Sequence, residues 1–451
     1  MMRTLSLAAG ALLLVGCATT EPYPVLQSDE PALETGSLAF TGIDGNLYVA
    51  APDADEIIQM TRDASPDAPA RRYSGYSWAG GELVYVTQDG TDAGEISTTL
   101  YAAEPGRARR VLYRKDGLAP FFLNPAPDGT RVGYLGNEAE SGTYVMGSVD
   151  LESGEHTLHG RGQPFYAAWS PDGAALITHV GLPGGRTASL LSIAGVNGGR
   201  TGEGAQPLEL SPGPFQTPDD APDGSSIAVV LRREGSSGIH ILSESGSDQG
   251  RLVTLQGSAG SVAWSPDGSR LAYIDGLYTR IGALVGRLFI ARFGSQRPQL
   301  ISEAAIAHFW SPDSTKLLYF EPVVLRGGGD ERLGYKVGMH SLLSGSSETI
   351  ATMVPAPTFA QQIIPFVDQY ERGYTIWSPD SRLVALNAQA VTGEPVIHLV
   401  DTETVVSGDA FRVSYSPVQA EESGELGLLP AEGVQSRAFV VGTVPFFSKV
   451  E

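Results

Sequence analysis

The first candidate for chemistry in this sequence is Ser77, which lies in the stretch GYSWA at residues 75–79. That stretch differs at its last position from the Gly-x-Ser-x-Gly elbow that carries the nucleophile of many serine hydrolases. The elbow requires a helix directly after the serine. Here the residues that follow, ELVYV at 82–86, alternate like a second strand. We therefore predict a structural role for Ser77 and assign no catalytic residue.

Metal and phosphate chemistry also finds little support. The seven histidines form no HExxH pattern, and the chain has a single cysteine. We interpret His156 and His159 as exposed loop residues on a strand-to-turn segment, where side chains three apart do not converge. The stretch GGGDE at residues 327–331 lacks the lysine and the helix of a phosphate-binding loop. We expect no metal site and no cofactor.

The N-terminal segment has one charge, Arg3, and an apolar run over residues 5–15 that is too short to span a bilayer. It is typical of a secretory signal peptide. The stretch LVGC at residues 14–17 resembles the lipobox of bacterial lipoproteins, in which the signal is removed before a cysteine that receives a diacylglycerol.

The lipobox resemblance implies a signal peptide at residues 1–16 and a lipidated flexible tether at residues 17–35, attached to the membrane through Cys17. Ala18 stands where the lipoproteins of enteric bacteria that stay at the inner membrane have an aspartate. The resemblance therefore favours the outer membrane or the cell surface. No later stretch reaches twenty uninterrupted apolar residues, so we expect the rest to be an extracytoplasmic domain held in the periplasm or at the surface.

The chain is acidic, with 51 Asp and Glu residues against 30 Lys and Arg residues and a formal net charge of −21. An acidic surface repels phosphate backbones and anionic headgroups, so nucleic acid is not expected as a partner. We interpret the acidity as a means of keeping an exported protein soluble.

The body of the chain is repetitive. The stretch WSPDG occurs at residues 169–173 and 264–268, and WSPDS occurs at 310–314 and 377–381. Degenerate copies lie near positions 78, 125 and 220, so seven anchors follow one another at intervals of 44 to 51 residues, except for a last interval of 67. This period is typical of a four-stranded propeller blade. We expect the tryptophan anchors to wedge between neighbouring blades; they are Trp78, Trp169, Trp264, Trp310 and Trp377.

Each repeat reads as a strand, a tight turn and a second strand. Proline presets the backbone of the turn, aspartate caps it through its side chain, and glycine takes the left-handed position. The 55 glycines and 30 prolines are spread evenly along the chain, which indicates many short strands. The sequence predicts an all-β fold.

Repeated WSPDG followed by an alternating strand resembles the WD-like β-propeller repeats of the TolB type, which also occur in the propellers of prolyl oligopeptidases and dipeptidyl peptidases. The resemblance covers residues 36–417. It implies a β-propeller, but the chain has neither the small N-terminal domain of TolB nor the hydrolase domain of the peptidases. Because propellers host unrelated activities, the resemblance does not assign a function.

We predict eight blades, with seven as the alternative. Residues 36–61 supply three strands and no inner strand, and residues 410–417 look like a lone inner strand. Pairing of these two segments would close the ring and remove exposed edges. The last segment, residues 418–451, is expected to be a tail that packs on the propeller.

Three insertions in neighbouring repeats fall on one rim, at residues 275–286, 321–334 and 354–373. The third has apolar residues at helical spacing, with Thr358 as a candidate cap and Pro365 as a break. Loops on a rigid scaffold commonly bind partners. The candidate partner-binding rim consists of Tyr278, Arg280, Arg326, Asp330, Arg332, Gln369, Tyr370 and Arg372. Alternatively, the helix only plugs the channel and the glycine-rich loop is disordered.

These patterns favour a non-enzymatic, lipid-anchored propeller that binds another protein or a peptide at the cell envelope. The first alternative is a binding site for a small ligand or glycan in the central funnel. Inner-strand residues would line that funnel, namely Arg72, Tyr73, Phe121, Tyr166 and Tyr374. The second alternative is an accessory propeller subunit of a peptidase or another hydrolase.

Overall fold

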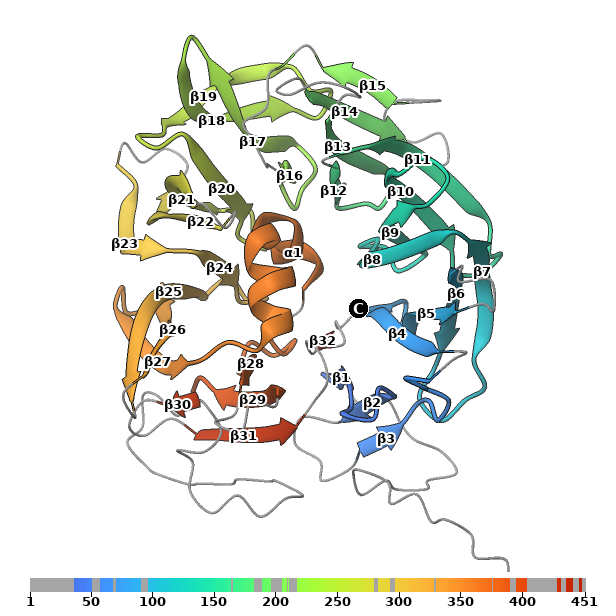
Figure 1. The fold of residues 1–451 in the computed structure, drawn as a ribbon. Helices are drawn as coiled ribbons and strands as arrows, with labels where there is room; N and C mark the ends of the chain where they lie inside the picture. The colour runs from blue at the N-terminus through green and yellow to red at the C-terminus, as the bar shows by residue number, and fades with distance from the viewer. Residues whose placement is uncertain are drawn as a thin grey trace, which may run out of the picture.

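The structure is a computed structural model in which strands radiate in sheets around a central space (Figure 1). The residues that it describes are 36–50, 57–67, 70–90, 96–163, 165–181, 189–195, 205–208, 210, 217–279, 283–292, 297–327, 330–374, 376–389, 395–403, 428–430, 435–440 and 446–447.

The strands group into antiparallel sheets, which we name A to H in chain order. Sheet A contains β1 (Leu38–Thr41), β2 (Leu47–Ala50), β3 (Ile57–Gln59) and β32 (Phe446–Phe447). Sheet B contains β4 (Arg71–Ala79), β5 (Glu82–Gly90), β6 (Ile96–Ala103) and β7 (Arg110–Asp116). Sheet C contains β8 (Leu118–Pro125), β9 (Arg131–Glu138), β10 (Thr143–Asp150) and β11 (His156–Gly162). Sheet D contains β12 (Phe165–Trp169), β13 (Ala175–Gly181), β14 (Ser189–Gly195) and β15 (Ala205–Leu208).

The second half of the chain repeats this plan. Sheet E contains β16 (Asp219–Asp220), β17 (Ser226–Arg233), β18 (Ser236–Ser243) and β19 (Asp248–Thr254). Sheet F contains β20 (Ala259–Trp264), β21 (Arg270–Tyr278), β22 (Leu284–Arg292) and β23 (Gln299–Ala305). Sheet G contains β24 (Ala307–Trp310), β25 (Lys316–Gly327), β26 (Asp330–Ser341), β27 (Ser347–Met353) and β30 (Leu428–Pro430). Sheet H contains β28 (Leu383–Gln389), β29 (Pro395–Asp401) and β31 (Gln435–Val440).

The predicted all-β propeller fold is confirmed. Within sheets B to F, each strand pairs with the next strand along the chain. Buried apolar side chains then join each sheet to its neighbour, as Val84 of sheet B and Val132 of sheet C do. Sheets A and H share such a cluster as well, which includes Phe40 and Ile397. The apolar core is therefore divided into layers between sheets, and each layer stabilises the ring by removing apolar surface from water.

The tryptophan anchors lie between neighbouring sheets, as the repeat pattern predicts. All five are buried, with at most 8% of their surface exposed. The indole N–H of Trp169 donates to the carbonyl oxygen of Asn124 at 2.8 Å, and that of Trp310 donates to the carbonyl of Ala263 at 3.2 Å. Each acceptor belongs to the inner strand of the preceding sheet. One side chain thus contributes both apolar packing and an inter-sheet hydrogen bond.

The repeated turns have the predicted chemistry, with one addition. In the turn after β20, the Asp267 carboxylate accepts from the Ser265 hydroxyl and from the Ser269 N–H, and Gly268 has a φ of +69°. In the next repeat Ser314 replaces the glycine and still has a φ of +61°. Its hydroxyl accepts a hydrogen bond from the backbone N–H of Asp267 at 2.9 Å, which links neighbouring sheets. This bond offsets part of the cost of a left-handed serine.

The C-terminal strands lie where the sequence did not predict them. We expected residues 410–417 to pair with the N-terminal strands, but those residues fall outside the described part of the chain. The strand that pairs with β1 is β32, through Leu38 opposite Phe447 and Ala39 opposite Phe446. The predicted tail also supplies β30 to sheet G and β31 to sheet H. This correction follows from the absence of any anchor motif in these strands, which left their register unmarked.

Ser77 lies within β4, buried and opposite Val84 of β5. It is therefore on a hairpin strand and not on a strand-to-helix bend, as predicted. Among the described residues, no helix has the length and apolar character needed to cross a membrane.

Candidate functional site

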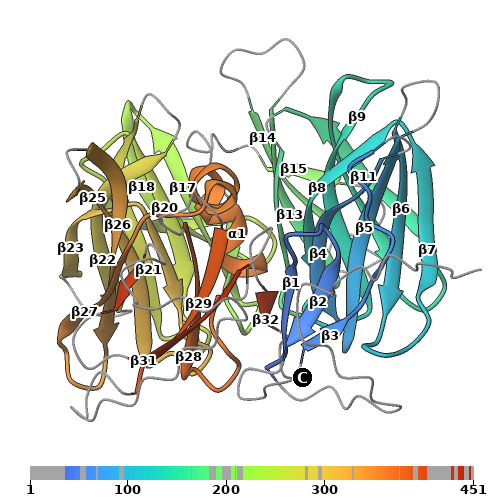
Figure 2. The same cartoon turned by 60° about the horizontal axis from the view of Figure 1, so that its bottom comes forward.

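The insertion at residues 354–373 forms the helical element in the centre of the ring. It comprises a π-helical turn, η1 (Phe359–Ile363), a 3-10 turn, η2 (Ile364–Phe366), and the helix α1 (Val367–Gly373). Pro365 lies in the 3-10 turn, so the predicted break is confirmed. Thr358 does not cap the helix, because its hydroxyl donates to the Asn387 side chain at 3.3 Å. Figures 1 and 2 both place α1 in the central space between the sheets.

Two polar side chains of α1 hold it against β12 and against the segment that precedes β16. The side-chain amide of Gln369 donates to the carbonyl oxygen of Ala167 at 2.6 Å, and its oxygen accepts from the Ala167 N–H at 2.9 Å. The Asp368 carboxylate accepts from the backbone N–H of Thr217 at 2.9 Å. The inner strands face the channel with one unpaired edge, so these bonds satisfy backbone groups that would otherwise lack partners in a buried place.

Apolar residues of the insertion complete this attachment. Phe359, Ile363 and Val367 are buried and join the same cluster as sheets C, D, G and H. The ring of Phe359 lies 5.4 Å from that of Phe320 of β25. Phe366 differs, because 44% of its surface is exposed. The predicted alternative of a helix that plugs the channel therefore describes most of the insertion. Phe366 does not take part in this packing to the same degree, because its ring is partly exposed.

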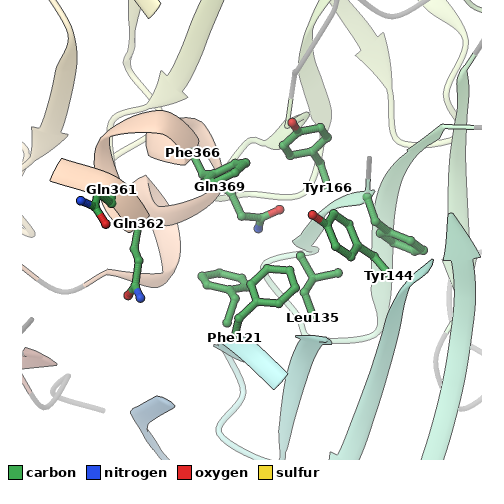
Figure 3. A pocket seen from close by; sticks show the side chains of 10 residues that line it. Phe121, Leu135, Tyr144, Tyr166, Gln361, Gln362, Phe366 and Gln369 are labelled. Carbon is green, nitrogen blue, oxygen red and sulfur yellow. The ribbon is translucent and has the colours of Figure 1, made fainter. Parts of the chain in front are cut away.

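A pocket of about 130 Å³ lies between part of this insertion and sheets C and D. Its aromatic walls are Phe121, Phe122, Tyr144, Phe165, Tyr166 and Phe366 (Figure 3). Leu135 and the glutamines Gln361, Gln362 and Gln369 complete the lining, and none of these residues carries a charge. Burial raises the pKa of Tyr166 well above its usual value, so its hydroxyl stays neutral. The arrangement suits an uncharged, apolar group.

The pocket brings together two of the residues predicted to line a funnel, Phe121 and Tyr166. The other three contribute elsewhere. Tyr73 is buried on β4 and its hydroxyl contacts Asp63, Tyr374 is buried beside Phe309, and Arg72 is exposed on β4. Of the five predicted funnel residues, Phe121 and Tyr166 therefore line the described pocket.

The structure describes the side chains of only three residues of the predicted partner-binding rim. Tyr278 ends β21 and is half-buried, and Arg332 is exposed on β26. Gln369 is 5% exposed and its amide is occupied by Ala167, so its assignment to an exposed rim is corrected: it holds the helix in place. The remaining members lie on β25, β26 and α1 without described side chains, or outside the described residues; they are Arg326, Asp330, Tyr370, Arg372 and Arg280.

The two long hairpins of this rim expose apolar side chains. Val324 of β25 stands opposite Leu333 of β26, and Leu277 of β21 lies on the neighbouring hairpin. Each is more than half exposed. Exposed apolar residues that stand opposite one another, as Val324 and Leu333 do, favour contact with another protein.

Histidine placement corrects an interpretation made from the sequence. His156 and His159 lie on β11 and are partly buried, where we expected exposed loop residues. His159 Nε2 lies 2.8 Å from the hydroxyl of Ser148, and burial lowers the pKa of His159 to about 4. Ser148 has no exposed surface, whereas His159 is partly exposed, so the hydroxyl of this pair is shielded from solvent. Within the described residues, no group of three or more His, Cys, Asp and Glu side chains could hold a metal ion.

One carboxylate, at the end of β9 in sheet C, lies in a strongly cationic environment. Glu138 accepts from Arg161 at 2.8 Å and from Lys115 at 2.6 Å, and these bonds lower its pKa to about 2. Glu138 is 2% exposed. This carboxylate is fully ionised and accepts hydrogen bonds from two cationic side chains, so it has no proton to exchange near neutral pH. We therefore assign it a structural role.

Sequence reasoning missed most of the pocket. Phe122, Leu135, Phe165 and the exposed glutamines of η1 come from different repeats and from the insertion. The one local signal was the doubled phenylalanine at 121–122, which breaks the alternation expected of a strand.

The chain is similar to several solved structures, each at low sequence identity. The chain is similar to TolB from Acinetobacter baumannii, with 13% identity, 82% coverage of each chain and a TM-score of 0.38. It is similar to the β-propeller domain of the Trilobed protease from Pyrococcus furiosus, with 13% identity, coverage of 62% of this chain and 83% of that one, and a TM-score of 0.43. It is also similar to the dihydro-heme d1 dehydrogenase NirN, with 14% identity, coverage of 94% and 79%, and a TM-score of 0.49.

No described protein family matches the sequence, and no curated protein matches it. At these identities the likeness to solved structures concerns the fold alone.

Proposed function

We propose that this protein is a non-enzymatic binding protein of the cell envelope whose partner is another protein or a peptide. The observation that carries the proposal is the aromatic pocket between the helical insertion and sheets C and D. A concave apolar site with a few polar groups at its edge is the usual form of a binding site. The exposed apolar residues of the β21–β22 and β25–β26 hairpins support a protein partner over a free small molecule.

The rest of the predicted architecture belongs to this proposal. Lipidation at Cys17 would hold the propeller at a membrane facing the cell exterior or periplasm. The described residues form eight hydrogen-bonded sheets, and sheets A and H share an apolar cluster; both observations support the proposal of eight blades, with seven as the alternative. Pairing of β32 with β1 supports a ring in which the C-terminal chain meets the N-terminal strands.

The second candidate is a small ligand or glycan bound in the funnel. The observation that favours it is the same pocket, because Phe121 and Tyr166 were predicted as funnel residues and both line it. Rings of this kind stack on sugars and on other planar groups. The accessory-subunit role has no separate structural support.

Site-specific photo-crosslinking in intact cells tests the proposal. A small diazirine amino acid at position 361, on the pocket edge, is expected to crosslink a discrete protein that mass spectrometry identifies. The matched control is the same amino acid at position 130, an exposed turn residue at the other end of the β9 strand. Phe121→Ala should abolish the product from position 361. Equal products from both positions, or a product that survives Phe121→Ala, would contradict binding at this pocket.

A further inference from the structure

We propose that the pocket is an anchor site for one aromatic side chain from the partner polypeptide, an inference that rests on the proposed function. The first argument is the shape of β8. Pro120 pairs with Gly136 and Phe122 pairs with Leu135, so Phe121 is an extra residue between two registered pairs. Such a bulge turns side chains away from strict alternation. It allows Phe121 and Phe122 to line the same pocket, where a regular strand would direct one of them to the opposite face.

The bulge is held by the neighbouring sheet. The carbonyl oxygen of Pro120 accepts from the Ser74 hydroxyl at 3.5 Å and from the Gln88 side-chain amide at 3.4 Å. β4 has a register shift of its own between Tyr73 and Gly75, next to Ser74. Two irregular inner strands therefore support each other at this position. Phe121 also packs edge-on against Tyr144, with ring centroids 5.4 Å apart, which fixes the wall of the pocket.

The size of the pocket limits its occupant. Its volume of about 130 Å³ is close to that of an engineered cavity of about 150 Å³, in a different protein, that binds benzene. One phenyl ring fits such a space, whereas a chain of sugar rings exceeds it. The Gln369 amide, which lies in the lining, is occupied by Ala167, so the polar groups of the aromatic walls are the hydroxyls of Tyr144 and Tyr166. The interior is therefore mostly ring surface, which suits an aromatic side chain better than a sugar with many hydroxyl groups.

The edge of the pocket suits a peptide backbone. Gln361 and Gln362 are exposed, and each carries an amide donor and acceptor that match peptide groups (Figure 3). The net charge of −21 disfavours acidic flanking residues. The occupant is thus a phenylalanine-type side chain in a neutral or basic segment of the partner.

Ligand-observed NMR with defined probes tests this anchor on the full chain. N-acetyl-L-phenylalaninamide should bind with a dissociation constant on the order of 1 mM, and N-acetyl-L-glutaminamide at least about tenfold more weakly. An acetylated Arg-Phe-Arg tripeptide amide should bind more tightly than its Glu-Phe-Glu counterpart, and the difference should shrink as salt is added. Phe121→Ala should weaken phenyl binding about tenfold or more, whereas Val111→Ala, an exposed apolar truncation on β7, should leave it unchanged.

Other outcomes would overturn the inference. If N-acetyl-L-phenylalaninamide does not bind at a concentration of about 20 mM, which is 20-fold above the expected dissociation constant, the aromatic anchor is refuted. Binding that Phe121→Ala leaves intact would refute it as well. Maltotriose that displaces the phenyl probe would assign the pocket to a glycan. Because Phe121→Ala changes a wall residue, Gln362→Trp serves as a second variant. Its larger side chain covers the pocket from the exposed edge and should reduce phenyl binding.

If position 361 crosslinks a protein but no phenyl probe binds, the anchor fails and the proposed function stands. If the probe binds but no protein crosslinks, the proposed function fails.

Discussion

Replacing Gln369 by alanine tests whether hydrogen bonds to an inner strand hold the helical insertion in place. In the native protein the Gln369 amide bonds to both backbone groups of Ala167, at 2.6 and 2.9 Å, and both residues are buried. The variant leaves a buried N–H and a buried carbonyl without these partners. At about 1 to 3 kcal/mol for each unsatisfied group, the free energy of unfolding should fall by about 2 to 6 kcal/mol. Water that enters the channel would place the result at the lower end.

The assay for this variant is urea unfolding followed by tryptophan fluorescence, together with amide hydrogen exchange at Ala167. A loss of about 2 kcal/mol in the local opening free energy corresponds to exchange roughly 30-fold faster. The matched control is Gln362→Ala, which truncates an exposed glutamine of the same insertion and should change stability by less than about 0.5 kcal/mol. If the two variants are equally stable and Ala167 keeps its protection, the polar attachment of α1 is refuted.

Three further perturbations probe the ring itself. Trp310→Phe keeps an aromatic ring but leaves the Ala263 carbonyl without its indole donor, so urea unfolding should show a loss of about 1 to 3 kcal/mol. Ser314 has a φ of +61°, and its replacement by glycine or by alanine removes the hydrogen bond to the preceding turn, but only glycine relieves the backbone strain. Ser314→Gly should therefore be about 1 kcal/mol more stable than Ser314→Ala in urea unfolding. The reverse order would contradict a strained serine. The pKa of Glu138 is lowered from 4.5 to about 2, so its contribution to stability is present above pH 4.5 and lost as the pH falls toward 2. Glu138→Gln should therefore lower the free energy of unfolding by about 1 to 2 kcal/mol at pH 7, a value that allows for solvent screening of the partly exposed cationic partners. The loss should be smaller at pH 3. A loss that does not depend on pH would show that the ionised carboxylate does not stabilise the fold.

The repeated parts of this fold were predictable because their signals are local. A tryptophan, a proline, an aspartate and a glycine within five residues fix a strand end and a turn, and the structure has Trp169 and Trp264 where the pattern predicts them. The strand that pairs with β1 was not predictable in the same way. β32 has two residues and no turn motif, so nothing in its local sequence specifies its register. Its pairing with β1 depends on the position of β1 in the folded protein.

The candidate site lay further from prediction than the fold. The helical spacing and Pro365 indicated an insertion that bends, which is correct. The contact that positions it joins Gln369 to Ala167 across 202 residues of sequence. No local pattern encodes such a contact, and a glutamine at helical spacing looks like a surface residue until its partner is known. The assignment of Gln369 to an exposed rim was wrong for this reason.

The attachment of the insertion and the pocket beside it are consequences of the same contact. Gln369 and Asp368 draw α1 toward inner segments of sheets D and E, at Ala167 and Thr217, because those backbone groups need partners. The bulged β8 holds its rings on the other side of the gap. Space remains where the insertion does not fill the gap to sheet C, and the half-exposed Phe366 closes that space from one side. A helix held by apolar packing alone would be free to settle into that space and fill it, whereas one fixed by directed hydrogen bonds cannot. The pocket therefore persists because polar groups, and not the apolar side chains that line it, set the position of the helix.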